Sequence, residues 1–435
     1  MDPEKQDERG PTPDTQQVGS VSEERGIVTK QVVIPDGGLQ AWLSVLGGFL
    51  VLTSTFGYSN SFGVYQELYV LEGASTSSNI SWIGSVQLFF MFAMGLPAGK
   101  LVDEGYFHHL LAIGSIIYVF CMFMLSLASP HKFYQLILSQ GVGMGIGAGL
   151  MLVPAVSIQA HHWQKRRSLA MGIVMTGSGV GGLFYPIMLN HLIQGHVGYK
   201  WGVRDSAFLT LGLLAIANCC MTTRLPNAKQ RPPGPKPDIK GIMSDPAFLI
   251  LLAGGFCVLW GLFFAYYYLQ LFALLHGIDS NLAFYTIAIL NGVSIFGRTL
   301  PNVLADKIGP LNVFIPVNCI TGALVFAMFG ATSRGAVVVF SILYGFFSGA
   351  SIALLPPTVA SVANNVQEIG VRMGLGYFVV SWAMLTGPPI DGALYDAGDV
   401  WYKPIIFSGV VILIGTVFIT IARHIYSGRK GTQRL

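Results

Sequence analysis

The stretch GVGMGIGAGLMLVP at residues 141–154 and the stretch GFFSGASIALLP at residues 345–356 are two copies of one pattern. Five residue pairs repeat at an offset of 202 to 205 positions: Gly143 and Gly345, Gly147 and Gly349, Pro154 and Pro356, Asp103 and Asp306, and Arg167 and Arg372. An offset that holds across three separate elements is hard to obtain by chance. It predicts a chain built from two copies of one unit, arranged as parallel repeats.

The composition indicates where such a chain folds. Its 435 residues are 52% hydrophobic and 11% charged, and the mean hydropathy is +0.59. Soluble globular proteins are about 25% charged, so a single water-exposed domain, a disordered chain and a nucleic-acid-binding chain are excluded. A membrane helix needs about 20 apolar residues, which leaves room for about twelve spans. The 53 glycines suit membrane helices that pack backbone to backbone.

Apolar stretches place the expected spans, so the fold class is all-α and polytopic, with two six-helix halves. The spans lie near residues 40–65, 80–102, 108–128, 133–157, 168–193, 203–222, 247–275, 281–304, 311–331, 335–360, 370–393 and 402–422. The predicted divisions are a disordered tail (1–38), a first half (39–222), a linker rich in Pro, Lys and Arg (223–246), a second half (247–422) and a short tail (423–435).

The distribution of Lys and Arg predicts the orientation. With the N-terminus in the cytoplasm, the outer loops hold five of the 25 basic residues: Lys132, Lys200, Arg204, Arg334 and Lys403. The remaining basic residues lie on the inner side, as the positive-inside rule requires. Both termini are therefore expected in the cytoplasm, and the protein is expected as a monomer in the plasma membrane.

Two short acidic loops are candidate gates. GKLVDEG (99–105) follows the second span, and LADKIG (304–309) follows the eighth. Asp103 or Asp306 can bind the positive N-terminal end of a neighbouring helix, or pair with a loop arginine. The candidate arginines are Arg166, Arg167 and Arg372. The alternative is a plain turn with a solvated aspartate, but the recurrence at the repeat offset favours the gate.

These loops resemble the signature of the major facilitator superfamily, whose second copy matches better because Glu104 replaces the usual arginine after Asp103. Other stretches resemble its monocarboxylate-porter family, in a fungal branch: Asp36, Gly37 and Gly38 with Trp42, KRRSLAMG (165–172), and Gly387, Pro388, Pro389, Ile390 and Gly392. The resemblance covers residues 36 to about 422. It implies twelve spans and alternating access to a central site between the halves, as in secondary transporters.

Arg298, in the eighth span, is the main charge expected inside the membrane. It lies six residues before Leu304, about 9 Å inside the helix end at about 1.5 Å per residue. A charge at that depth marks a functional site, and the guanidinium fork matches a carboxylate. The alternative is an arginine that snorkels or pairs with a gate. The resemblance implies carboxylate binding at this position, but the porters' nearby Asp is Ser294 here and their Lys in the first span is Asn60.

Polar residues within spans are the other candidate solute contacts, since polar groups at membrane depth must face protein or a cavity. We single out Asn60, Gln270 and Asn291, with Tyr58, because an amide is harder to satisfy within its own helix than a hydroxyl. Asn79 begins the only Asn-x-Ser/Thr sequon, N-I-S, and is a candidate glycosylation site on the outer side.

Several patterns are given structural interpretations. Gly177, Gly179 and Gly182 match a dinucleotide-binding pattern by letter, but without a preceding strand they indicate close helix packing. The five cysteines lie in apolar runs without metal-ligand spacing and are expected as small buried hydrophobes. The loop histidines at 108–109 and 161–162 are expected to be solvated. No cofactor or metal site is predicted.

The sequence thus predicts a secondary transporter and not an enzyme, because no catalytic triad or nucleotide loop is found. Its partners would be a small organic solute, the lipid bilayer, a proton as candidate coupling ion, and no nucleic acid. The solute is expected to be a carboxylate-bearing metabolite or vitamin-like compound. The alternative is export of a fungal secondary metabolite, and a more remote one is a membrane sensor that transports nothing.

Overall fold

The computed structural model describes residues 36–75, 77–224, 239–364, 368–396 and 401–434. The predicted disordered tail and most of the predicted linker lie outside these residues. The described residues belong to one structural unit, Ile34–Leu435. They contain twelve helical stretches long and apolar enough to cross a membrane, which confirms the predicted fold class.

The first six spans are built from twelve helical elements, several of them consecutive pieces of one span. Their bounds are α1 (Leu39–Leu52), the π-helical segment η1 (Thr53–Gly57) and α2 (Phe62–Leu71); α3 (Ser77–Ala93) and α4 (Gly95–Asp103); α5 (Phe107–Leu127); α6 (Phe133–Leu136), the π-helical segment η2 (Ile137–Met144), α7 (Gly145–Ser157) and the 3₁₀ turn η3 (Ile158–His161); α8 (Arg167–Gln194); and α9 (Gly198–Cys220).

The last six spans follow a short helix, α10 (Ile239–Met243). Their bounds are α11 (Pro246–Leu262) and α12 (Phe264–Leu275); α13 (Ser280–Ile308); α14 (Pro310–Ala327) with the 3₁₀ turn η4 (Met328–Gly330); α15 (Arg334–Ser361); α16 (Ile369–Asp396); and α17 (Tyr402–Lys430). Each predicted span coincides with one of these stretches. The twelfth continues to Lys430, so most of the predicted C-terminal tail is helical.

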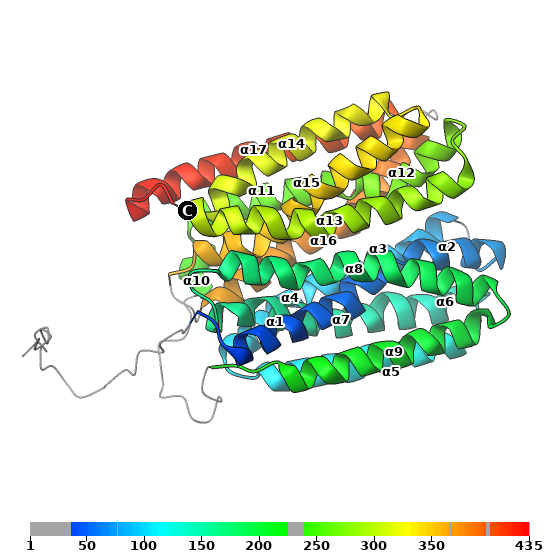
Figure 1. Cartoon of the computed structure of the whole chain (residues 1–435), viewed down its shortest axis with the longest axis horizontal. Helices are drawn as coiled ribbons and strands as arrows, with labels where there is room; N and C mark the ends of the chain where they lie inside the picture. The colour runs from blue at the N-terminus through cyan, green and yellow to red at the C-terminus, as the bar shows by residue number, and fades with distance from the viewer. Residues whose placement is uncertain (1–35, 76, 225–238, 365–367, 397–400, 435) are drawn as a thin grey trace, which may run out of the picture. The chain divides into compact units, whose positions relative to one another are not determined.

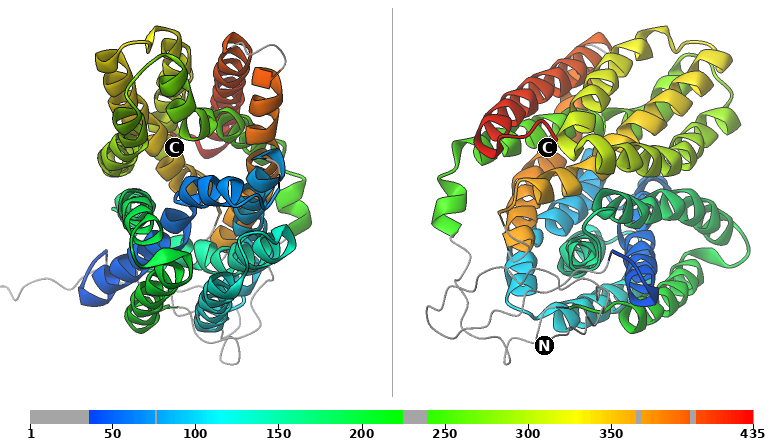
Figure 2. Two further views of the ribbon diagram at one scale, coloured as in Figure 1. Left: turned by 90° about the vertical axis from the view of Figure 1, so that its right-hand side faces the viewer. Right: turned by 60° about the vertical axis from the view of Figure 1, so that its left-hand side comes forward.

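The elements α1–α9 and α11–α17 form two groups of helices that lie against each other (Figure 1). Viewed along the helices, each group is a bundle of its own (Figure 2). The end of the molecule that carries the loops 104–106 and 162–166, at the left in Figure 1, is called the basic end because Lys165, Arg166 and Arg167 lie there. The opposite end, with the loops 72–75 and 276–279, is called the far end.

Local sequence signals fix where several helices begin. Asp245 accepts a hydrogen bond from the backbone N–H of Ala247 (3.1 Å) and precedes a proline at the first position of α11. Asp279 and Ser333 cap α13 and α15 in the same way. Such side chains satisfy backbone donors that a helix start leaves without partners.

Glycines of α8 hold two neighbouring helices at backbone distance. A Cβ added at Gly177 would lie 2.2 Å from the carbonyl oxygen of Phe49, and one at Gly181 would lie 2.4 Å from that of Thr53, both in the first span. Gly179 faces the opposite neighbour, because its Cβ would meet the side chain of Arg298 in α13 at 2.9 Å. In the pattern that matches a dinucleotide-binding motif by letter, Gly177 and Gly179 therefore serve helix packing.

The repeat of glycines needs one correction. Gly345 and Gly349 pack on the eighth span, but their partners at the offset of 202, Gly143 and Gly147, pack on the third span and not on the second. The glycines that meet the second span are Gly145 and Gly149. The reason is that η2 is π-helical just before them, with a different turn per residue, whereas α15 is one α-helix.

Replacing Gly177 by alanine is expected to destabilise the protein. The added methyl overlaps backbone of the first span, and overpacking of this kind costs about 1–3 kcal/mol. The melting temperature of the purified protein should fall for Gly177→Ala and stay unchanged for Gly212→Ala, where a Cβ meets open space. Equal melting temperatures would contradict the packing role.

Candidate functional site

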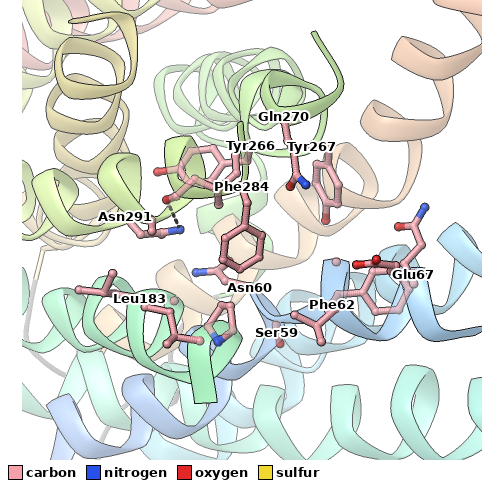
Figure 3. A pocket seen from close by; sticks show the side chains of 18 of the residues that line it. Ser59, Asn60, Phe62, Glu67, Leu183, Tyr266, Tyr267, Gln270, Phe284 and Asn291 are labelled. Carbon is pink, nitrogen blue, oxygen red and sulfur yellow. Dashed lines mark hydrogen bonds between the residues drawn. The ribbon is translucent and has the colours of Figure 1, made fainter. Parts of the chain in front are cut away.

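A cavity of about 180 Å³ lies where the two groups of helices meet (Figure 3). Its wall comes from α2 and the break before it, from α3, α8 and α13, and from α12 and the break before it. Its volume is close to the ~150 Å³ of an engineered protein cavity that accepts benzene. The lining residues are Ser59, Asn60, Phe62, Gly63, Val64, Gln66, Glu67, Leu88, Gly182, Leu183, Pro186, Ile187, Phe263, Tyr266, Tyr267, Gln270, Phe284, Ile287, Ala288 and Asn291.

The wall is aromatic and amide-rich, with little charge. Phe62, Phe263, Tyr266, Tyr267 and Phe284 supply ring faces. Of the described lining residues one is charged, Glu67, and it is exposed toward the far end. An aromatic wall with a few amides suits a flat organic molecule better than a small anion.

Three of the predicted contact residues line the cavity: Asn60, Gln270 and Asn291. Asn60 donates from Nδ2 to the carbonyl of Ser178 (3.3 Å), and Asn291 donates from Nδ2 to the carbonyl of Ile287 (3.1 Å). The Oδ1 atom of Asn291 is buried without a hydrogen-bond partner among the described residues. Both amides approach Gly182, where a Cβ would lie 2.6 Å from Asn60 and 2.9 Å from Asn291.

The other two predicted contacts, Arg298 and Tyr58, lie outside the wall. Arg298 is 1% exposed, and its Nη1 donates to the hydroxyl of Ser178 (2.7 Å) and to the carbonyl of Met175 (3.3 Å), both in α8. The Tyr266 phenol, which lines the cavity, approaches the guanidinium. Arg298 thus ties α8 to α13 next to the cavity, because its helix turns it toward α8.

Tyr58 belongs to a cluster within the first half. Its hydroxyl is hydrogen-bonded to the hydroxyls of Tyr65 and Ser206, the latter at 3.3 Å, and its ring packs edge-on against Tyr185. The side chain is buried there and does not reach the cavity.

The two candidate gates contact helix N-termini. The carboxylate of Asp103 accepts hydrogen bonds from the backbone N–H groups of Gly370 (3.2 Å) and Val371 (2.7 Å) at the start of α16. The carboxylate of Asp306 accepts from those of Ser168 (2.8 Å) and Leu169 (2.9 Å) at the start of α8. Each contact joins one half to the other, and each places a negative charge at the positive end of a helix.

The predicted arginine partners contribute less directly. Arg372 pairs with Glu368 (3.3 Å), the residue just before α16, and lies over the ring of Phe248. Arg167 interacts electrostatically with Asp306, and Arg166 is exposed. The sequence allowed each aspartate to bind a helix N-terminus or a loop arginine. In the structure, the hydrogen bonds of both carboxylates go to a helix N-terminus.

Backbone contact and aromatic rings close the basic end. Gly99 of α4 approaches so near that its Cβ would lie 2.1 Å from the carbonyl oxygen of Gly370, and Gly374 of α16 meets Gly95 in the same way. Between this contact and the cavity lies a layer of rings from both halves. It consists of Phe56, Phe92, Phe263 and Tyr377, with centroid distances of 5.5–6.5 Å along the chain of contacts.

The loop before α8 is held by Asp36 and Trp42, whose structural role does not follow from the family motif alone. Asp36 has a positive φ of 48° and accepts hydrogen bonds from the backbone N–H groups of Gln164 and Lys165. Trp42 packs edge-on against Trp163 at 5.1 Å. The Asp-Gly-Gly stretch with Trp42 therefore anchors the loop that presents the N-terminus of α8 to Asp306.

The expectation of solvated histidines is wrong for residues 161–162. His162 is 0% exposed, accepts at Nδ1 from Arg224 Nε (3.1 Å), and contacts the carbonyl of Thr222 at 2.8 Å through Nε2. Burial lowers the pKa of His162, and Arg224 lowers it further, while the Thr222 carbonyl acts in the opposite sense. The histidines are buried because residues 222–224, which follow α9, fold back over this loop.

The predicted glycosylation site lies in the first turn of α3 at the far end. Asn79 is exposed, and its Nδ2 donates to the hydroxyl of Ser75 (3.0 Å). Among the described residues, no group of three or more His, Cys, Asp or Glu side chains is arranged to hold a metal ion.

Comparison with known proteins identifies the family that has this arrangement of helices. The family model described as Major Facilitator Superfamily matches residues 44–364 and 302–434. The chain belongs to this superfamily. The human organic anion transporter MFSD10 (TETRAN) shares the fold, with a TM-score of 0.66 and 15% identity over 88% of this chain and 97% of that chain. The outward conformation of the transporter FucP matches with a TM-score of 0.67 and 14% identity over 87% and 99%.

Fungal relatives are closer in sequence. The aspyridones efflux protein apdF of Emericella nidulans is 41% identical over 92% of this chain and 81% of its own length. The agnestins efflux protein AgnL12 of Paecilomyces divaricatus is 39% identical over 88% and 87%. The protein is thus a multi-pass membrane transporter of this superfamily.

Arg298→Gln is expected to slow the transport of anionic and neutral solutes by a similar factor. The reason is that the guanidinium joins α8 to α13 outside the cavity wall, and hydrogen bonds to a charged group contribute about 1.5–3 kcal/mol. The measurement is the initial rate of vesicle uptake of one monocarboxylate and one neutral aromatic compound. A rise in KM confined to the anion would instead make Arg298 a solute ligand.

Proposed function

We propose that this transporter exports an uncharged, aromatic organic metabolite of the kind fungi secrete. The observation that carries the proposal is the cavity wall, with five aromatic rings, four amides and one carboxylate at its mouth among the described residues. The names of the relatives support it, because those proteins are called efflux proteins for aspyridones and agnestins. Export is therefore better supported than the carboxylate or vitamin-like solute that the sequence first suggested.

The resemblance to monocarboxylate porters supports a shared helical scaffold more than it supports a shared solute. We propose the porter-like branch for this chain on the stretch Asp36–Gly38 with Trp42, which anchors the loop before α8. The wall of the cavity has no cationic side chain among its described residues. A shared scaffold with a different wall is consistent with a solute other than a small carboxylate.

The charge distribution supports an orientation with the basic end in the cytoplasm. The structure then corresponds to an outward-facing state, since the basic end is closed by Asp103, Asp306 and the glycine contacts. The first and seventh spans are broken at Asn60 and Phe263, 203 positions apart, and both breaks line the cavity. Broken helices at matching positions of two repeats are a feature of solute sites in transporters.

Transport itself tests the solute class. Inside-out plasma-membrane vesicles from cells that express the protein should accumulate aspyridones or agnestins, and should not accumulate lactate. The matched variants are Gly182→Val, which fills the space between Asn60 and Asn291, and Gly212→Val, which faces open space. Export should be lost in the first and kept in the second. Saturable lactate transport without metabolite transport would restore the carboxylate hypothesis.

Neutralising a gate carboxylate is expected to open the basic end. Asp103→Asn or Asp306→Asn removes charge-assisted hydrogen bonds worth about 1.5–3 kcal/mol, which corresponds to a tenfold or larger shift between the two states. Spin labels at His109→Cys and Lys307→Cys, in a background without the five native cysteines, should report a longer distance in a larger fraction of molecules. Arg166→Gln is the control, and an unchanged distribution in both Asp variants would rule out the gate.

A further inference from the structure

A second acidic site lies inside the second half, away from both gates. Asp391 of α16 is 1% exposed, and its Oδ1 accepts a hydrogen bond from the hydroxyl of Ser408 in α17 (3.1 Å). Its Oδ2 is buried without a hydrogen-bond partner among the described residues. Ser408 follows the first residue of α17 by six positions, so the carboxyl lies about 9 Å inside the far end at about 1.5 Å per residue.

The surroundings of Asp391 offer little compensation for a negative charge. Across the described parts of the chain, no Lys, Arg or His forms an ion pair with it. The ionisable groups that face it are phenols: Tyr344 from α15, and Tyr268 from α12, whose hydroxyl donates to the carbonyl of Pro388 (3.0 Å). From α11 the indole of Trp260 lies against Gly387, while α3 and α4 meet α16 nearer the basic end, at Trp382 and Gly374.

A buried carboxyl in this setting is costly unless it serves a purpose. A carboxylate at membrane depth needs a cation or several donors, and ionisable groups there are as a rule functional. One serine hydroxyl supplies one donor. Adding a proton removes the net charge and lets the carboxyl donate from its second oxygen, so the group suits a site that is loaded and unloaded with a proton.

Asp391 is connected to the solute cavity through Tyr344. The Tyr344 hydroxyl donates to the carbonyl of Leu262 (2.6 Å), at the break between α11 and α12. Tyr344 lies within electrostatic reach of both Asp391 and Tyr266. Tyr266 lines the cavity and contacts Ser348, whose hydroxyl binds the carbonyl of Tyr344. A change of charge at Asp391 therefore acts on the break in the seventh span.

We propose that Asp391 is the proton-binding site that couples inward proton flow to solute export. In the outward-facing state a proton from water at the far end binds Oδ2, and the carboxylate becomes a carboxylic acid. After the basic end opens, the proton leaves to water on the cytoplasmic side, and solute enters the cavity for export. This assignment rests on the proposed function for its direction, and on the geometry of Asp391 for the site.

Infrared difference spectroscopy tests the site without any solute. A step in pH on the reconstituted protein should produce a carbonyl band of a protonated carboxyl group that appears and disappears reversibly. Asp391→Asn should abolish this band, and Asp391→Glu should keep it at a shifted frequency. Ser381→Ala, a buried change on the same helix, should leave it unchanged. A band that persists in Asp391→Asn, or no titrating band in the wild type, would overturn the assignment.

Vesicle transport tests the coupling, with aspyridones as the probe. An acidic lumen should drive wild-type accumulation, and Asp391→Asn should reduce it at least tenfold while exchange of labelled for unlabelled solute stays within about twofold. Tyr344→Phe should keep the infrared band and weaken the coupling. Undiminished pH-driven accumulation in Asp391→Asn overturns the coupling but leaves export standing. A titrating band at Asp391 without transport of any aspyridone would instead count against the proposed function.

Discussion

The closure of the basic end depends on the approach of backbones across the two halves. Lipid tails are as apolar as leucine side chains, so membrane helices gain little from burying apolar surface against each other and associate through close packing. Gly99 against Gly370, and Gly95 against Gly374, bring α4 and α16 to backbone distance. This approach places the Asp103 carboxylate within hydrogen-bond reach of the N–H groups that begin α16.

The same logic holds on the other side of the interface, with different residues. Gly172 of α8 admits the backbone of Arg298 and the side chain of Asn302, and one turn further on Asp306 reaches the start of α8. Arg298 then adds one hydrogen bond to Ser178 and one to the carbonyl of Met175, beside the cavity. One helix pair, α8 and α13, therefore carries both the Asp306 contact at the basic end and residues of the cavity wall.

Sequence patterns predict the spans and the contacts of Asp103 and Asp306 with helix N-termini, because both follow from local chemistry. An apolar stretch of about twenty residues is long enough to cross the membrane. An aspartate in a short turn can bind the positive N-terminal end of a nearby helix. Side-chain direction was harder to predict. The depth of Arg298 along its helix was clear, but the rotation that turns it toward α8 depends on Gly179, which lies far away in sequence. The burial of His162 does not follow from its own stretch of sequence for a similar reason, since residues 222–224 cover it.

Asp391 shows how a motif can conceal a functional residue. It lies between Ile390 and Gly392 of the stretch that begins at Gly387. The packing of α16 against α11, α15 and α17 buries it. Arg298 is equally buried, yet it has two hydrogen-bond acceptors in α8 and the approach of Tyr266. The arginine is therefore suited to remain charged and to hold helices together. The carboxyl of Asp391 has fewer hydrogen-bond partners, so it is suited to change between the ionised and the protonated form.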